Sequence, residues 1–203
     1  MSFLNMTAPI LYRAMPEEIV FDEKEALAFL GASGLHPDER LCQMLARSKQ
    51  ELSSSLIYRA CALELPLAFE GEGMLSIGDL QVKSKDLSSH LQGCSSVLLM
   101  AATVGIEADR KIAAKGRISA FEGALFDALA SVAIEAWCDK LEEKLTAGIT
   151  SRPRYSPGYG DLSLSFQAPI LSLLNAGHYI GLTVTKSEML SPTKSVTAVI
   201  GIA

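Results

Sequence analysis

The segment Arg152–Asp161 reads Arg-Pro-Arg-Tyr-Ser-Pro-Gly-Tyr-Gly-Asp, and an apolar segment that begins at Gln167 follows it. Its two prolines fix φ and remove backbone donors, while its two glycines allow backbone conformations that other residues rarely adopt. Two arginines and two tyrosines stand beside this stiff turn. Such a loop can place backbone polar groups, a fixed cation and aromatic rings around a small polar ligand. Because similar residues also occur in ordinary connections between elements, the loop alone leaves both interpretations open.

The sequence of residues 154–159, Arg-Tyr-Ser-Pro-Gly-Tyr, resembles the R-x-x-PGY signature of the activation domain of vitamin B12-dependent methionine synthase, which binds S-adenosylmethionine (AdoMet). Residues 177–196 resemble that domain's closing segment, with its Gly, Leu-Thr, Ser, Met, Pro and Ser-Val pattern. Residues 101–105 and the region around 128–136 are similar to small stand-alone versions of the domain. The resemblance runs in order over roughly residues 20 to 203, which makes it far more specific than the loop alone.

The resemblance implies an α+β fold, in which helices pack against a mostly antiparallel sheet. We expect residues 1–203 to form a single activation-domain-like domain, with residues 1–20 as a strand or an N-terminal arm. The implied function is reactivation of a cobalamin methyltransferase whose cobalt has been oxidised to the inactive cob(II) state. In this family a separate electron donor reduces the cobalt, and AdoMet then supplies the methyl group. Cobalamin would come only through a partner, a corrinoid-carrying methyltransferase protein.

The resemblance also implies which residues hold AdoMet. Arg154 matches the family's arginine, and a guanidinium can pair with the methionine carboxylate of AdoMet in a two-pronged contact. Glu135 falls where the family has a glutamate near AdoMet, able to accept bonds from ribose hydroxyls or to complement the ligand's cationic parts. The residues after the arginine would supply backbone groups, close approach and an aromatic wall; they are Ser156, Pro157, Gly158, Tyr159 and Gly160.

Several features of the sequence leave alternatives open. Arg152 takes the role of Arg154 if the register of the loop is shifted by two residues. The tyrosine expected in the family's last strand falls at Ile200, which has no hydroxyl, and the family's N-terminal aspartate contact has no evident counterpart. A second function is therefore a non-catalytic module that keeps the fold and senses AdoMet or docks on a corrinoid protein. A generic AdoMet methyltransferase of Rossmann type is disfavoured, because no G-x-G-x-x-G-like loop follows an early strand.

Hydrophobic periodicity and turn signals predict the elements around this loop. A long helix is expected from about Ser119 to Thr146, with Asp127, Ser131 and Glu135 on roughly one face at a spacing of four residues. Gly177 is expected to end the last helix. The other predicted helices cover residues 22–31, 37–63, 86–91, 106–114 and 167–175, and the predicted strands cover residues 65–70, 74–82, 96–103, 179–185 and 195–202.

Composition excludes several classes of partner. The 203 residues carry a net charge of −5 and no basic run, which argues against nucleic acid or an anionic membrane surface. No apolar run reaches the roughly 18 residues that a spanning helix needs. The four cysteines and three histidines are scattered, so a zinc site is not expected, and isolated thiols are typical of a reducing compartment. We therefore expect a cytoplasmic protein with no metal site and no catalytic residue of its own.

A second short pattern lies at residues 88–93, Ser-Ser-His-Leu-Gln-Gly. It has the shape of a cobalamin-binding D-x-H-x-x-G motif, but serine stands where the aspartate would orient the metal-binding imidazole. A histidine at the end of a helix, before a glycine that stops it, accounts equally for the pattern. We therefore expect the chain to carry no corrinoid of its own.

Overall fold

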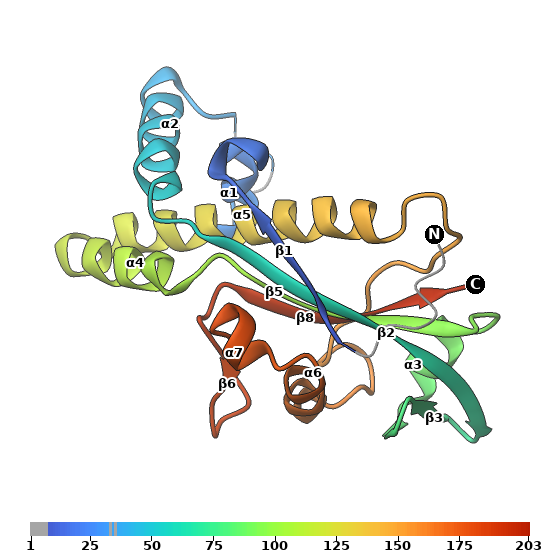
Figure 1. The fold of residues 1–203 in the computed structure, drawn as a ribbon. Coiled ribbons are helices and arrows are strands. Elements are labelled where there is room, and N and C mark those ends of the chain that lie inside the picture. The colour runs from blue at the N-terminus through green and yellow to red at the C-terminus, as the bar shows by residue number, and fades with distance from the viewer. Residues whose placement is uncertain (1–7, 33, 35) are drawn as a thin grey trace.

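The structure, a computed structural model, describes residues 8–32, 34 and 36–203. Its centre is an antiparallel sheet with the strand order β4-β3-β2-β5-β8, and β1 pairs with the first part of β2 (Figure 1). The α+β architecture expected from the sequence is confirmed. Of the proposed N-terminal arm, residues 1–7 lie outside the described residues, and β1 follows them. The strands are β1 Ile10–Ala14, β2 Tyr58–Gly71, β3 Met74–Ile77, β4 Leu80–Lys83, β5 Ser96–Thr103 and β8 Ser195–Ile202.

Strand β5 lies between β2 and β8, and all eight of its residues are buried. Because side chains alternate along a strand, its residues divide between two hydrophobic clusters. Leu98 and Met100 belong to the cluster that contains the long helix, whereas Val97 and Leu99 belong to the cluster on the other face. A strand covered on both faces reads as a continuous apolar run, which is why residues 96–103 were predicted correctly.

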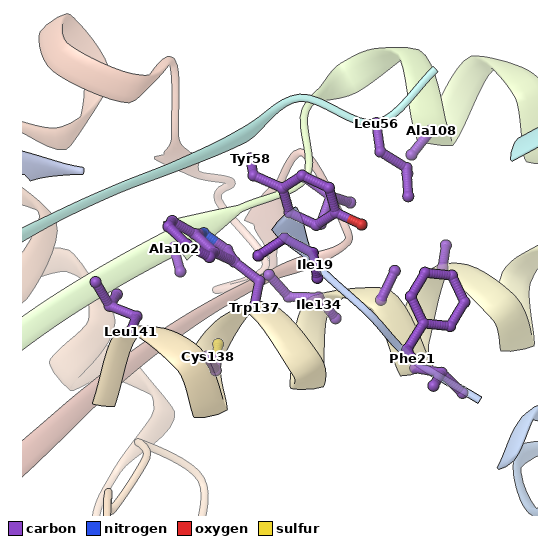
Figure 2. Packing of buried hydrophobic residues seen from close by; sticks show 14 of the residues in the cluster. Ile19, Phe21, Leu56, Tyr58, Ala102, Ala108, Ile134, Trp137, Cys138 and Leu141 are labelled. Atoms are coloured by element: carbon purple, nitrogen blue, oxygen red, sulfur yellow. The ribbon is translucent and has the colours of Figure 1, made fainter. Parts of the chain in front are cut away.

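Helix α5 (Ala120–Leu145) covers one face of the sheet. The Ser119 hydroxyl accepts a hydrogen bond from the backbone of Glu122 at 3.4 Å, as expected of a residue that caps a helix. Trp137 packs edge-on against Tyr58 with ring centroids 5.9 Å apart (Figure 2). Its indole nitrogen donates to the carbonyl of Arg59. Both the position and the length of this helix agree with the sequence prediction.

Further helices complete the two outer layers. Helices α1 (Ala26–Phe29) and α2 (Glu39–Ser53) pack on α5, and α4 (Ile106–Ile118) crosses it closely. The opposite face of the sheet is covered by α3 (Lys85–His90), α6 (Gln167–Leu173) and α7 (Ala176–Ile180). A short hairpin of β6 (Thr183–Val184) and β7 (Leu190–Ser191) precedes β8, and single 3-10 turns lie at Pro16–Glu18, Glu23–Glu25 and Leu164–Phe166. No helix in the described part of the chain is long and apolar enough to cross a membrane.

The predicted helix over residues 37–63 is too long. Helix α2 ends at Ser53, and strand β2 begins at Tyr58. The first residues of β2 face a hydrophobic cluster on each side of the sheet, with Ala60 in one cluster and Cys61 in the other. Burial on both faces removes the alternation that marks a strand, and the apolar residues then mimic a helical stripe.

Three smaller predictions are also wrong. Residues 74–82 form two strands, because Gly78 adopts φ 55° and turns the chain between β3 and β4. Asp86, the first residue of the predicted helix over 86–91 and the cap expected from its side chain, does not cap α3; the Ser84 hydroxyl does, by accepting from the backbone of Leu87 at 3.0 Å. Gly177 lies inside α7, so residues 176–180 are helical, and Gly181 with φ 71° ends that helix.

Candidate functional site

A cavity of about 340 Å³ opens where α5, the loop of residues 151–162, α6 and the start of β8 meet. This volume lies at the lower end of the range for pockets that hold small organic ligands, about 300–1,000 Å³. The cavity is lined by Glu135, Arg154, Tyr155, Ser156, Pro157, Tyr159, Gln167, Leu190, Ser195, Val196 and Thr197. Five of the seven site residues predicted from the sequence therefore line one cavity. One of them comes from α5 and the other four from the loop after it.

Arg154 is held by three carboxylates of α5. Its Nη2 lies 2.8 Å from Glu135 Oε2, and its Nη1 lies 2.6 Å from Asp139 Oδ1 and 2.8 Å from Glu142 Oε2. The backbone N–H of Arg154 also donates to Glu142 Oε1 at 3.1 Å. Positions 135, 139 and 142 share one face of a helix, because they are four and three residues apart. The guanidinium thus fastens the loop to α5.

The ionic environment of this cluster is negative. Partial burial acts to lower the pKa of Arg154, but hydrogen bonds to Glu142, Asp139 and Glu135 outweigh it and raise the pKa above its usual value. One cation therefore faces three carboxylates. A ligand carboxylate would compete with them for this guanidinium, and Asp139 is the most exposed of the three, at 68% of its side chain.

The second arginine points elsewhere. Arg152 Nη2 donates to the carbonyl of Gln92 at 3.0 Å, and its backbone N–H donates to the carbonyl of Gly201. Arg152 is absent from the cavity lining, so of the two arginines in the loop only Arg154 faces the cavity with Glu135.

The two glycines of the loop shape it but do not line the cavity. Gly158 has φ 94°, and its N–H donates to the carbonyl of Leu162 across the turn. Gly160 has φ 51°, and a Cβ built there would collide with the carboxylate of Asp86 and the hydroxyl of Tyr155. These positions need glycine because a left-handed backbone and close packing both exclude a side chain.

The far end of the loop is tied to α3 by two reciprocal carboxylates. Asp161 accepts from the Ser84 hydroxyl and from the backbone of Lys85 and Asp86, and Asp86 Oδ2 accepts in return from the backbone of Asp161. Hydrogen bonds from Ser84 and from the Lys85 backbone lower the pKa of Asp161. Asp161 was not predicted to have a role, because its partners lie about 75 residues away along the chain.

His90, the histidine of the short pattern at residues 88–93, also contacts this loop. Its Nε2 lies 2.8 Å from the carbonyl oxygen of Pro153, and its ring centroid lies 5.1 Å from that of Tyr155. Tyr155 in turn packs edge-on against Tyr159, whose side chain is largely exposed at the mouth of the cavity. Within the described ranges, no cluster of three or more His, Cys, Asp or Glu is placed to hold a metal ion.

The polar face of α5 divides into two parts. Lys194 Nζ lies 2.9 Å from both Asp127 Oδ1 and Ser131 Oγ, which fixes the connection before β8 against the helix. Glu135 is the member of the stripe that reaches the cavity. The helical spacing predicted a shared face correctly, but only the tertiary structure separates its structural part from its cavity-lining part.

Three polar residues of the cavity were not predicted from the sequence. Gln167 is 5% exposed, and its amide nitrogen donates to the carbonyl of Glu188 at 2.8 Å. Ser195 and Thr197 stand at the start of β8. Each of these residues stands at the beginning of an otherwise apolar segment. That pattern is too common in protein sequences to mark a residue as part of a site.

Comparison with known proteins identifies the fold. No family model matches the chain, and no curated protein matches its sequence. Among solved structures, one described as the MetH reactivation domain bound to AdoHcy superposes with a TM-score of 0.73 over 96% of this chain and 78% of that chain. This chain has the MetH reactivation-domain fold. The sequence identity is 17%, so the similarity to the MetH domain establishes the fold and leaves the ligand to be argued from the cavity.

Proposed function

We propose that this chain binds AdoMet in the cavity between α5 and the 151–162 loop, and that it acts as a reactivation module for a cobalamin methyltransferase. One observation carries the proposal. Glu135 and the segment from Arg154 to Tyr159 converge on a single cavity, within the fold of a domain whose structure was solved with AdoHcy.

The cavity offers complementary groups for each part of AdoMet. The carboxylates around Arg154 suit the sulfonium and ammonium charges, and Glu135 can also accept from ribose hydroxyls. The methionine carboxylate would pair with Arg154 through guanidinium N–H groups that Glu135, Asp139 and Glu142 leave free. Backbone groups of Ser156 and Pro157 and the ring of Tyr159 would complete the wall, while Gly158 and Gly160 hold the loop in shape.

In the proposed reaction this chain supplies binding and orientation. An electron from a separate donor reduces cob(II)alamin on a partner protein. The methyl group then passes from the sulfur of AdoMet to the cobalt, and AdoHcy is left behind. Holding the methyl group in line with the cobalt is an orientation effect that requires no acid or base from the chain. We place this module in the cytoplasm, where its four free cysteines would stay reduced.

The test has two stages. Calorimetric titration of the pure protein with AdoMet should show saturable binding at one site. The protein is then mixed with a corrinoid protein in the cob(II) state, a reductant and AdoMet, and growth of methylcobalamin absorbance is followed with and without it. Faster growth supports the reactivation function, and failure to bind AdoMet or any corrinoid protein leaves only a shared fold.

The alternative is a module that senses AdoMet or docks on a corrinoid protein without supporting methylation. Two observations favour it. The Arg154 guanidinium is already paired with three carboxylates, and Ile200 is a fully buried apolar residue where a tyrosine was expected. AdoMet binding with no acceleration of methylcobalamin formation, using several corrinoid proteins, would identify this second function.

A further inference from the structure

Strand β1 lies at a margin of the sheet, where it pairs with β2 (Figure 1). The direction of its backbone groups follows from β2, since Leu67 N–H donates to the carbonyl of Ser95, just before β5. The odd-numbered residues of β2 therefore direct N–H and C=O toward β5, and the even-numbered ones toward β1. Because Arg13 lies opposite Arg59, Arg13 and Leu11 direct theirs away from β2, to the outer edge of β1.

The outer edge of β1 has no backbone partner among the described residues. Leu11 is 42% exposed, and Arg13 is exposed as well. Free N–H and C=O groups on an edge strand form a template on which another extended segment can add as a further strand. The backbone groups of two neighbouring positions are therefore accessible to a binding segment.

Arg13 and Arg59 provide a second, independent observation at this edge. They are directly opposed in a non-hydrogen-bonded pair, the arrangement in which side chains of neighbouring strands come closest. In the described part of the chain, none of the ion pairs includes either guanidinium. Residues 1–7, 33 and 35 contain no aspartate or glutamate, so their side chains supply no counter-ion either. Opposed like charges are unfavourable, and a carboxylate between them would remove the repulsion.

The charge of this edge selects among the segments that could bind there. A second copy of β1 would bring another pair of arginines onto the same face, so pairing between two copies is disfavoured. The chain carries a net charge of −5 and no basic run, which disfavours nucleic acid and anionic membranes. An extended acidic segment meets both conditions, because it can bond to the free backbone groups and supply the missing carboxylate.

We propose that a partner protein adds an extended acidic segment as a strand on the outer edge of β1. The backbone of the segment bonds to Leu11 and Arg13, and its residue opposite Arg13 is a carboxylate that Arg13 and Arg59 hold together. Two positions away along the segment, the residue opposite Leu11 is apolar. This surface is separate from the cavity, because β2 and β5 lie between β1 and β8, so the inference does not depend on AdoMet binding.

The test uses the full chain and two fluorescein-labelled peptides. The first is Thr-Val-Thr-Glu-Thr-Val-Thr, in which a valine falls opposite Leu11 whichever way the peptide runs, and the second has lysine in place of the glutamate. Fluorescence anisotropy should show that the glutamate peptide binds at least several-fold more tightly than the lysine peptide. Amide hydrogen exchange followed by NMR should slow at Leu11 and Arg13 when the glutamate peptide is added.

Arg13→Glu should abolish the preference for the glutamate peptide, because the variant supplies a carboxylate to Arg59 from within the chain. Its melting temperature should stay equal or rise, since an opposed pair of like charges becomes a pair of opposite charges. Arg47→Glu is the matched control. It changes the net charge by the same amount at an exposed position of α2, and it should keep the preference.

Several results would overturn the inference. Equal affinity of the wild type for the two peptides, or binding of neither, would show that the edge does not select an acidic segment. The same loss of preference in Arg47→Glu would reduce the effect to net charge. Slow exchange of the Leu11 and Arg13 amides before any peptide is added would show that the chain itself or a second copy already covers the edge.

Discussion

At the residue scale, the two arginines of the loop have separate roles that a single pair of substitutions can distinguish. Arg154→Ala should weaken AdoMet binding by about 1.5–3 kcal/mol, the range for a hydrogen bond to a charged group. Arg152→Ala should leave the affinity unchanged, because Arg152 contacts the carbonyl of Gln92 outside the cavity. Calorimetry on both variants, after thermal melts have established folding, gives the comparison. If only Arg152→Ala loses affinity, the arginine that contacts the ligand is Arg152, and the role proposed for Arg154 is wrong.

The charge of the cavity predicts a preference between two related ligands. Three carboxylates contact the single guanidinium of Arg154, so this cluster of charges beside the cavity is net negative, and Glu135 is its member on the cavity wall. AdoMet carries a sulfonium charge that AdoHcy lacks, and opposite charges attract most strongly at low ionic strength. The chain should therefore bind AdoMet several-fold more tightly than AdoHcy in dilute buffer, and this ratio should shrink in about 0.5 M salt. Competitive titration at two salt concentrations measures it, and a preference for AdoHcy would contradict the charge argument.

At the element scale, the crossing of α4 and α5 depends on two glycines that are not equivalent. A Cβ on Gly123 would lie 2.7 Å from Gly116 Cα, whereas a Cβ on Gly116 would lie 3.9 Å from Gly123 Cα. Gly123→Ala should therefore destabilise the protein by about 1–3 kcal/mol through overpacking, despite the better helix propensity of alanine.

Gly116→Ala is the control at the same crossing. It has room for the methyl group and should be neutral or stabilising by up to about 1 kcal/mol, because alanine favours the helix. Denaturant unfolding of the two variants measures both changes. Equal effects of the two substitutions would show that the helices separate freely, and the close crossing would then have no energetic role.

At the scale of the whole molecule, the two hydrophobic clusters should protect most of the thiols. Burial raises the pKa of Cys61 and of Cys138 to about 12, so hardly any reactive thiolate forms near pH 8. Cys94 is also buried, whereas Cys42 is partly exposed on α2. A thiol reagent at pH 8 should modify one cysteine quickly and three only as fast as the protein opens. Cys42→Ser should remove the fast phase, and rapid modification of Cys61 would show that the sheet is open in solution.

Several elements have local signals that are enough to predict them. Strand β5 is an apolar run between Ser96 and Thr103, and β8 is mostly apolar. Helix α5 begins at a serine cap and keeps its apolar spacing to Leu145, so the positions of all three follow from the chain alone. The loop was also visible in the sequence, because proline and glycine restrict or extend backbone conformation wherever they stand. The residues of the loop resemble a known signature, and the fold that this resemblance implies is the fold of the structure.

The way these elements form a cavity depends on contacts that appear only in the folded chain. Which arginine faces it depends on three carboxylates of α5 that meet Arg154 across a turn, and the sequence offers both arginines equally. Among the described residues, Thr197 has no backbone partner on the outer edge of β8, because Pro157, forty residues earlier, has no N–H and the chain turns away there. Contacts between residues distant in the chain are set by packing and pairing, which local spacing does not encode. The cavity is therefore a property of the assembled sheet and helix, even though most of its residues were recognisable one by one.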